Sequence, residues 1–180
     1  MKSVVLAVVG LFAVSTGVPA QSAIEMALSA APAGLREDAA VIQWRADFSY
    51  ETLKDGTNHL VCYDRSTQRN RRPFEVQCTT KANLGRVEQN RRFRAATADG
   101  AEERAMIGAA EADGTRAPVE YGSIWYAAAG ADYASAASHT TIAVPGATGE
   151  STGFPTTRDS GGVYLMQAGT GGAHLMVPGR

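Results

Sequence analysis

Polar and apolar residues alternate strictly between Gln43 and Thr52, with Trp44 and Phe48 on one side and charged residues on the other. A period of two residues is typical of a β-strand with one buried face. The pattern predicts either a single half-buried strand or a hairpin of two strands, if the chain turns near Asp47. Aromatic residues on the apolar side favour packing against a core.

Two more strands are predicted after the turn sequence KDGTN at 54–58. The segment HLVCY at 59–63 is apolar and short, and PFEVQCT at 73–79 alternates again, with Cys78 on its apolar face. Both segments have the length and composition of strands bounded by turn residues. The first half of the chain is therefore expected to be mainly β-structure.

Helical signals are confined to the middle of the chain. Asp99, with Glu102 three residues later, has the spacing of an N-terminal capping box. The sequence that follows, at 100–113, is rich in alanine and charged residues, and Gly114 is placed to end a helix there. A second helix is predicted at Ala82–Arg94.

The last third of the chain returns to strand patterns. The segments 119–130 and 139–144 are rich in aromatic and β-branched residues, and 163–177 predicts a hairpin around Gly169–Gly172. Strands, then helices, then strands are typical of an α+β fold. We expect a single compact domain with a mostly antiparallel sheet, one or two helices and one disulfide.

The first twenty residues have the pattern of a secretory signal peptide. A positive start at Met1–Lys2 precedes an apolar run at 4–14, and Val18–Ala20 supplies small residues for cleavage after Ala20. The apolar run is too short to span about 30 Å of hydrocarbon. We therefore expect an exported, soluble protein, periplasmic or extracellular, with no transmembrane segment in its mature form.

After this segment the chain changes character twice. Residues 21–40 are alanine-rich and contain few large apolar side chains, so we expect a loosely structured lead-in with a short helix near Ile24–Ala30. Residues 41–180 are expected to form the single α+β domain. A chain of this length buries a sizeable core without needing metals.

The two cysteines are Cys62 and Cys78. In an exported protein a single pair of cysteines predicts a disulfide. The alternative, a pair of metal-binding or redox thiols, is disfavoured because the spacing is neither that of a C-x-x-C motif nor that of a zinc knuckle. A loop of this length predicts a stabilisation of about 3 kcal/mol.

The formal net charge is −1, so the overall charge predicts no partner. The segment 65–94 nevertheless holds nine basic residues and only two acidic ones. Clustered arginines bind phosphate and carboxylate groups, and the candidate anion-binding residues are Arg69, Arg71, Arg72, Arg91, Arg92 and Arg94. An envelope polyanion is the expected partner if one is bound, and nucleic acid is not expected. The alternative is a solvated basic face that pairs with the acidic helix of the same domain.

His139 and His174 each precede a Val-Pro-Gly sequence. If their strands share a sheet, the two imidazoles are candidate ligands for Zn²⁺ or Cu²⁺, with His59 or Asp132 as a third ligand. No other cofactor is indicated. The alternative is two partly buried histidines that bond to the backbone near strand ends.

The sequence His139-Thr140-Thr141 resembles one half of the signature of the two-histidine phosphoesterases. Members of that family carry two His-x-Thr/Ser motifs on neighbouring strands, in which the histidines act as general acid and base and the hydroxyl groups hold the phosphate. The second half of the pattern is not matched, because Leu175 and Met176 follow His174.

These observations predict a binding or envelope-associated protein rather than an enzyme. The sequence pairs no nucleophile with a base and contains no dense metal-binding motif. A two-histidine site, used for metal binding or for phosphoesterase-like hydrolysis, is the alternative.

Overall fold

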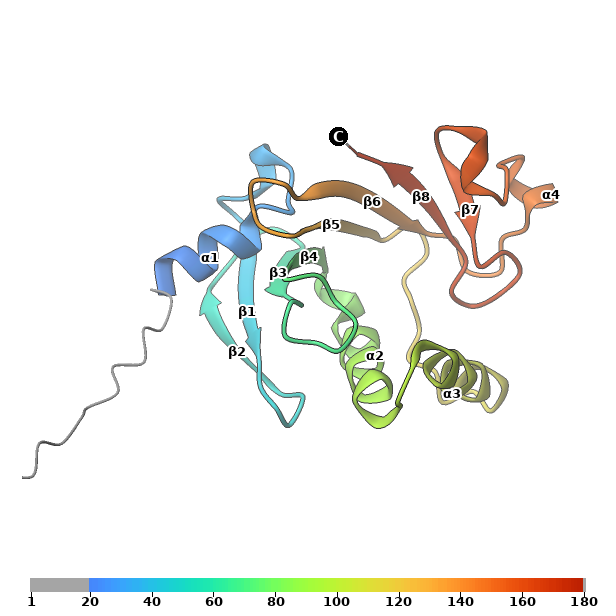
Figure 1. The fold of residues 1–180 in the computed structure, drawn as a ribbon, viewed down its shortest axis with the longest axis horizontal. Helices are drawn as coiled ribbons and strands as arrows, with labels where there is room; N and C mark the ends of the chain where they lie inside the picture. The colour runs from blue at the N-terminus through green and yellow to red at the C-terminus, as the bar shows by residue number, and fades with distance from the viewer. Residues whose placement is uncertain (1–19, 180) are drawn as a thin grey trace, which may run out of the picture.

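The computed structural model describes residues 20–179 of the 180-residue chain, so the predicted signal peptide lies outside the described residues except for Ala20. One eight-stranded sheet has the spatial order β2-β1-β3-β4-β5-β6-β8-β7 (Figure 1). Its strands are β1 (Ala40–Trp44), β2 (Tyr50–Lys54), β3 (Leu60–Asp64), β4 (Phe74–Thr80), β5 (Ile124–Gly130), β6 (Ala137–Ala143), β7 (Tyr164–Met166) and β8 (His174–Pro178). All neighbouring strands are antiparallel except β1 and β3. The predicted α+β domain with a mostly antiparallel sheet is confirmed.

The alternating segment 43–52 forms a hairpin and not one long strand. β1 and β2 are antiparallel neighbours, and between them Phe48 adopts a positive φ of 70°. The Asp47 carboxylate accepts hydrogen bonds from the N–H and the hydroxyl of Ser49, at 3.0 and 2.6 Å. An aspartate that bonds to its own backbone two residues on favours a turn, which explains why the chain reverses at this residue.

Strand β3 lies on the other side of β1 and runs parallel to it. The connection after β2 therefore crosses the start of β1, where a Cβ on Gly56 would overlap backbone atoms of Ala39 and Ala40. Glycine alone allows two backbones to approach this closely. The turn sequence at 54–58 thus carries the chain past the start of β1 and does not close a hairpin between β2 and β3.

The predicted disulfide is present. Cys62 on β3 and Cys78 on β4 lie opposite each other in the antiparallel register, and both side chains are fully buried. Because the two residues are 16 positions apart in the sequence, the bond closes the β3–β4 hairpin covalently. This restricts the unfolded chain and stabilises the native one.

Helix α1 (Ala20–Leu28) covers the sheet at the disulfide (Figure 1). Ala27 and Ala31 are buried against Leu60 and the two cysteines, and Ala39 has no exposed surface. The structure here differs from the loosely structured lead-in predicted for 21–40. Small side chains bury little area each, but they let the helix pack closely on a flat, bridged sheet.

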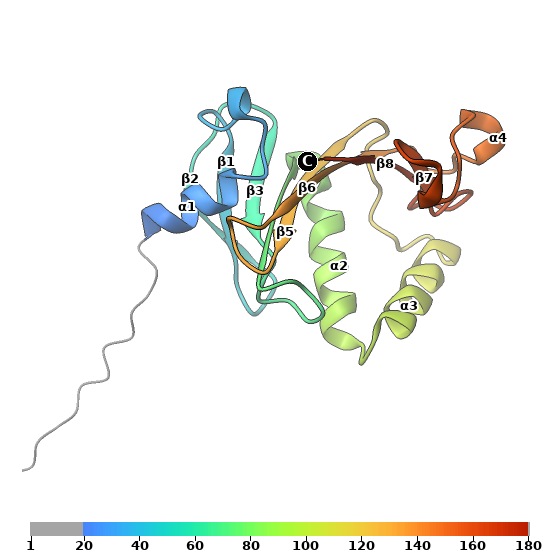
Figure 2. The same ribbon diagram turned by 45° about the horizontal axis from the view of Figure 1, so that its top comes forward.

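Helices α2 (Leu84–Ala96) and α3 (Gly100–Ala112) lie on the opposite face of the sheet (Figure 2). Successive residues of a strand point to opposite faces, and β3 shows the division. Cys62 packs on the α1 side, whereas its neighbours Val61 and Tyr63 cluster with Val87 of α2.

The two central helices occupy the predicted positions. The Asp99 carboxylate caps α3 by accepting hydrogen bonds from the N–H groups of Ala101 and Glu102, at 2.7 and 3.0 Å. The Glu102 carboxylate accepts from the N–H of Ala98, one residue before the cap. Gly114 has a φ of 77° just beyond the helix, as a glycine that ends a helix does. Helix α1 corresponds to the short helix predicted near Ile24–Ala30, and the short helix α4 (Gly149–Thr152) was not predicted.

The C-terminal part of the chain extends the sheet away from α1. β7 and β8 form the predicted final hairpin, with Met166 opposite His174, so the connection runs from 167 to 173 and includes the predicted Gly169–Gly172 turn. Within residues 20–179 there is no helix long and apolar enough to cross a membrane.

Candidate functional site: an arginine-lined cavity

A cavity of about 530 Å³ lies between the sheet and helices α2 and α3. Its floor includes Trp125 of β5, Thr141 of β6 and Met176 of β8, which lie side by side in the strand registers and so form a row across one face. Gln77 of β4 continues this floor toward α2. The volume is within the range of small-molecule binding sites.

The lining of this cavity is strongly basic. Seven of the 17 lysines and arginines in the chain line it, all of them arginines, and they face only two carboxylates, Glu103 and Glu111. Seven positive charges against two negative ones leave an excess of five. The arginines are Arg65, Arg71, Arg86, Arg91, Arg94, Arg104 and Arg116.

Charged residues on α2 and α3 face each other because they recur at multiples of four residues along each helix. Arg86 and Arg94 of α2 are eight residues apart, as are Glu103 and Glu111 of α3, and residues at multiples of four share a helix face. The Arg94 guanidinium lies 2.6 Å from the Glu103 carboxylate, and that of Arg86 lies 4.0 Å from Glu111. Two ion pairs therefore join the facing sides of the two helices.

Four of the arginines gather toward the C-terminal end of α2, and we call them the four-arginine group: Arg65, Arg71, Arg91 and Arg94. Arg65 and Arg71 share the buried carboxylate of Glu75, at 3.5 and 3.2 Å. Arg94 is paired with Glu103. The group thus contains four cations and has two carboxylates for partners.

Arg91 is the member of this group that forms no ion pair with another described residue. Its guanidinium lies over the Trp44 ring, 5.1 Å from the ring centre. Its Nε and Nη1 atoms, and Nε of Arg71, are buried without a hydrogen-bond acceptor among the described residues. A buried donor without an acceptor is unfavourable by roughly 1–3 kcal/mol. Because these atoms have almost no exposed surface, the group offers a bound anion the unpaired charge of Arg91 and not these donors.

The pKa values of Arg71 and Arg91 reflect the burial and the mutual repulsion of the four-arginine group. Burial, together with the neighbouring charges of Arg65 and Arg94, lowers the pKa of Arg71 to about 10. Burial also lowers the pKa of Arg91, with contributions from the same two neighbours. Repulsion among like charges disfavours the charged forms. An anion bound within the group would relieve that repulsion.

Both histidines predicted as site residues line the cavity, but the strand register separates them. His139 lies opposite Pro178 in the β6–β8 ladder, whereas His174 lies opposite Ala143. Four residues along a strand put their Cα atoms about 13 Å apart, so the register does not set the two imidazoles opposite each other. Nδ1 of His174 is 2.8 Å from the carbonyl oxygen of Gly172.

The proposed third ligands lie elsewhere. His59 is exposed and outside the cavity lining, and the Asp132 carboxylate accepts hydrogen bonds from the N–H and hydroxyl of Ser135 in a turn. Within the described part of the chain, no three or more histidine, cysteine, aspartate or glutamate side chains are grouped to hold a metal ion. His139 and His174 are therefore not assembled with His59 or Asp132 into a Zn²⁺ or Cu²⁺ site.

The six predicted anion-binding arginines are divided by the fold, and three line the cavity: Arg71, Arg91 and Arg94. Arg69 instead donates to the carbonyl oxygens of Ala98 and Arg94, at 2.7 and 2.8 Å, and so braces the turn between the two helices. Arg92 is exposed and paired with Glu88 at 2.7 Å, and Arg72 is exposed. The Arg94–Glu103 pair shows that part of the basic segment does pair with the acidic helix, as the alternative predicted.

Sequence reasoning missed four of the cavity arginines. Arg65 and Arg86 fall within the basic segment but outside its two dense clusters, and Arg104 and Arg116 come from other segments. The spacing of Arg86, Asn90 and Arg94 was a usable signal, because residues four apart form one polar stripe on a helix. Such a stripe is usually taken as a solvated face, and here it faces α3 and the cavity.

The arrangement provides a partly enclosed space with a positive wall and a mixed apolar and polar floor, which is suited to holding an anion by hydrogen bonds and charge. Comparisons with protein-family models, with curated proteins and with solved structures found no match to this chain. Function is therefore inferred from the cavity itself.

Proposed function

We propose that this protein is an exported, non-enzymatic domain that binds a small organic anion in the cavity between the sheet and helices α2 and α3. The observation that carries the proposal is the excess of positive charge in the cavity lining, where Arg91 forms no ion pair among the described residues and its group of four arginines has Glu75 and Glu103 as carboxylate partners. An anion placed there would offset the excess charge.

The rest of the lining supports an organic anion over a bare inorganic ion. Val87, Ile107, Trp125 and Met176 present apolar surface in the same cavity. A ligand with an apolar body would bury that surface, at about 25 cal/mol per Å² removed from water. A carboxylic acid or a phosphate ester of modest size fits both the charge and the volume.

Export is the part of the proposal that rests on the N-terminal sequence. The signal-peptide pattern at 1–20 directs the chain to an oxidising compartment, and the Cys62–Cys78 disulfide is compatible with that environment. Whether the protein stays in the periplasm or leaves the cell does not affect the chemistry of the cavity.

An envelope polyanion is less well supported as the ligand. A long polyanion needs a continuous exposed basic surface, and of the six predicted arginines Arg72 and Arg92 are exposed, with Arg92 already paired. Polyanion binding would weaken steeply with salt and would be reduced in the R72A/R92A variant, which removes the two exposed arginines of the six. Binding within the cavity should depend on Arg91 and tolerate the substitution of Arg72.

Hydrolysis of a phosphate ester is the second candidate function. His139 lines the same cavity as the four-arginine group, and its pKa is lowered by burial and by the charge of Arg65, which favours a neutral imidazole able to act as a base. Release of phenol from phenyl phosphate, abolished in H139N, would establish this activity. Its absence, with binding retained, would leave the binding function alone.

The proposal is tested by calorimetric titration of phenyl phosphate and octanoate into the protein and two variants. We expect saturable binding to the native protein and an affinity at least about tenfold lower in R91Q, equivalent to about 1.4 kcal/mol. R92Q is the matched control, because it removes the same charge from the next residue of α2, outside the cavity. If neither anion binds, or if both variants weaken binding equally, the proposal is wrong.

A further inference from the structure

A second cavity, of about 540 Å³, lies between the C-terminal part of α2, the β1–β2 hairpin and the connection between β3 and β4, and we call it the hairpin cavity. The hairpin contributes Trp44 and Phe48 to its lining, and the β3–β4 connection contributes Arg69. Arg91 and Arg94 line both cavities, so the two spaces adjoin. The volume is again within the range of small-molecule binding sites.

The lining of the hairpin cavity contains four arginines and no aspartate or glutamate. Arg45 and Arg94 pair with carboxylates that lie outside this lining. Arg69 and Arg91 form no ion pair with another described residue. Two positive charges without a carboxylate partner therefore face this space.

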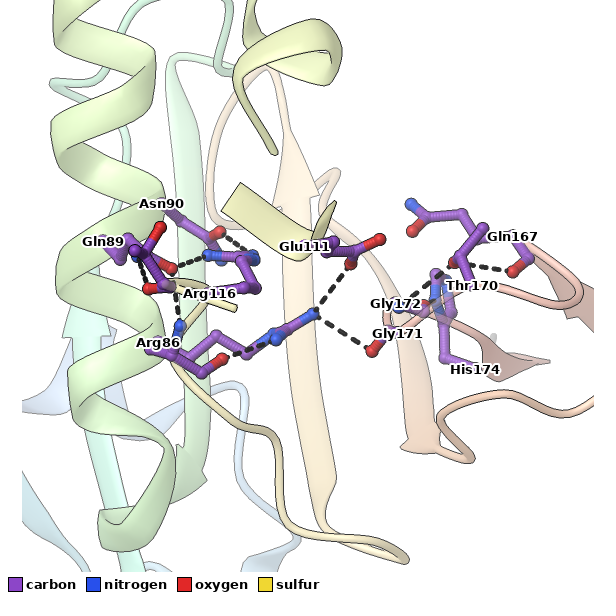
Figure 3. Close-up of polar contacts among 12 residues, drawn as sticks. Arg86, Gln89, Asn90, Glu111, Arg116, Gln167, Thr170, Gly171, Gly172 and His174 are labelled. Carbon is purple, nitrogen blue, oxygen red and sulfur yellow. Dashed lines mark hydrogen bonds and ion pairs between the residues drawn. The ribbon is translucent and has the colours of Figure 1, made fainter. Parts of the chain in front are cut away.

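Arg69 is held in position by neutral groups. Its terminal nitrogens donate to the carbonyl oxygens of Ala98 and Arg94, at 2.7 and 2.8 Å. Arg116 in the first cavity is held in a similar way, because two side-chain amide oxygens of α2 accept from its terminal nitrogens (Figure 3). Neutral acceptors fix a guanidinium without cancelling its charge, so Arg69 remains a positioned cation.

The aromatic residues of the hairpin cavity are positioned by their neighbours. The Arg91 guanidinium lies 5.1 Å from the centre of the Trp44 ring, and that of Arg92 lies 4.7 Å from the centre of the Phe48 ring. The Tyr63 ring is nearly perpendicular to that of Trp44, with 6.2 Å between the ring centres. Cations and aromatic rings thus border the same space in fixed positions.

Phe48 occupies its place in spite of an unfavourable backbone conformation. Its φ of 70° is uncommon for a bulky side chain. Glycine or asparagine would adopt this φ at a lower cost in free energy. Strained residues of this kind cluster at ligand-binding and active sites, so the ring indicates a role in binding and not in forming the turn.

We infer that the hairpin cavity is a second anion-binding site, which takes a small aryl anion. The carboxylate or phosphate group of the ligand would face Arg69 and Arg91, since arginine binds both groups. The ring of the ligand would contact Trp44 and Phe48, because aromatic rings favour stacked or edge-to-face contacts with one another. Arg69 and Phe48 do not line the first cavity, so this site can exist whether or not the first one binds an anion.

The two tryptophans of the chain make the test specific, because Trp44 lines only the hairpin cavity and Trp125 only the first one. W125F keeps a fluorescent reporter in the hairpin cavity, and W44F keeps one in the first cavity. The probe is 4-nitrobenzoate, an aryl anion that quenches tryptophan fluorescence on contact. We expect saturable quenching in W125F. Quenching there that does not saturate, and only equals that of free N-acetyltryptophanamide, would overturn the inference.

The same titrations separate this inference from the proposed function. Saturable quenching in W44F but not in W125F would refute the second site and leave the first one standing. Saturable quenching in W125F alone would support the second site only. If neither variant shows saturation, neither cavity binds the aryl anion and the second site is refuted.

Substitutions in the W125F protein identify the residues that bind. R69Q should lower the affinity for 4-nitrobenzoate about tenfold, and R69K, which keeps the charge, should retain most of it. F48N removes the ring and tolerates the positive φ, and it should also weaken binding. R72Q is the matched control, from the same basic segment but outside the lining. Native affinity in both R69Q and F48N would overturn the inference.

Competition tests the ligand class. Benzoate should displace 4-nitrobenzoate from the W125F protein at a lower concentration than cyclohexanecarboxylate, which has the same charge but no aromatic ring. Equal displacement by the two acids would overturn the assignment of an aryl ligand.

Discussion

The two faces of the central sheet have opposite characters, although the same strands form both. On the α1 side, Leu60, Cys62 and Cys78 are fully buried against the alanines of the helix, in an apolar layer closed by a disulfide. On the α2–α3 side the sheet faces a cavity of about 530 Å³ walled by arginines. The first region is closed, whereas the second combines a buried cluster of Val61, Tyr63 and Val87 with the cavity in which we propose that the anion binds.

Strand β4 illustrates the division within a single segment. Val76 and Cys78 point into apolar clusters, while Gln77 lines the cavity and Glu75 holds two of its arginines. The alternation of a strand separates such environments at every residue. A substitution should therefore affect either stability or ligand affinity according to the parity of its position.

The largest expected effect is on the α1 face. Leu60→Ala should reduce the free energy of unfolding by roughly 2–5 kcal/mol, because it opens a void in a layer without exposed surface. Anion affinity of the remaining folded protein should stay within about twofold, a difference of less than 0.5 kcal/mol. Urea denaturation and calorimetric titration measure the two quantities. Ile107→Ala, in the cavity wall, is the matched variant on the other face. It should lower the anion affinity more, and the free energy of unfolding less, than Leu60→Ala does.

Removal of the disulfide should have the next largest effect. The variant C62S/C78S should lose about 3 kcal/mol of stability, since its unfolded chain is no longer restricted. The same titration should give nearly native affinity, because the bond lies on the face away from the cavity. A large loss of anion binding in the folded variant would show that the two faces are coupled.

A cavity arginine should behave in the opposite way. Replacing Arg91 by methionine removes a cation that forms no ion pair within residues 20–179 and keeps an apolar contact with Trp44. We expect the free energy of unfolding of the ligand-free protein to rise by about 1 kcal/mol and its anion affinity to fall. Replacing a charge that serves binding and has no partner commonly stabilises a protein at the cost of its function. Differential scanning calorimetry without ligand measures this. A melting temperature that falls as far as in the Leu60 variant would contradict the assignment of Arg91 to binding.

The smallest effect concerns pH. Burial, the charge of Arg65 and the nearby His174 lower the pKa of His139 in the folded protein, while Glu75 opposes them. The unfolded chain therefore binds this proton more readily, so stability is full above about pH 6.5 and falls as the pH drops through the folded-state pKa. H139N should reduce that loss when urea denaturation is compared at neutral and mildly acidic pH. H59N, at an exposed histidine, is the control, and an equal change in both variants would remove His139 as the cause.

Local features of the sequence predicted most of the secondary structure. The alternation around Asp47, the capping aspartate at Asp99, the glycine after α3 and the pairing of Cys62 with Cys78 are all present in the structure. Each depends on residues close together in the chain or on the chemistry of a unique pair. These are the interactions that a single sequence encodes directly.

The candidate site was predicted less completely. Three of the six nominated arginines reach the cavity, and the two histidines reach it at separate positions. A basic stripe on α2 has the same sequence pattern whether it faces water or a sheet. The packing of Val87 against Val61 and Tyr63 holds α2 on the sheet, and the β6–β8 register sets the positions of the two histidines.

The sequence by itself thus determined the elements, their ends and the one covalent link, because periodicity and capping act over two to four neighbouring residues. Only the tertiary structure decided strand order, register and which side of α2 is enclosed. Those depend on contacts between distant segments, where shifting a strand by one residue moves every side chain to the other face. The arginine-lined cavity is a product of that second level, since its seven arginines come from separate segments that the fold brings together.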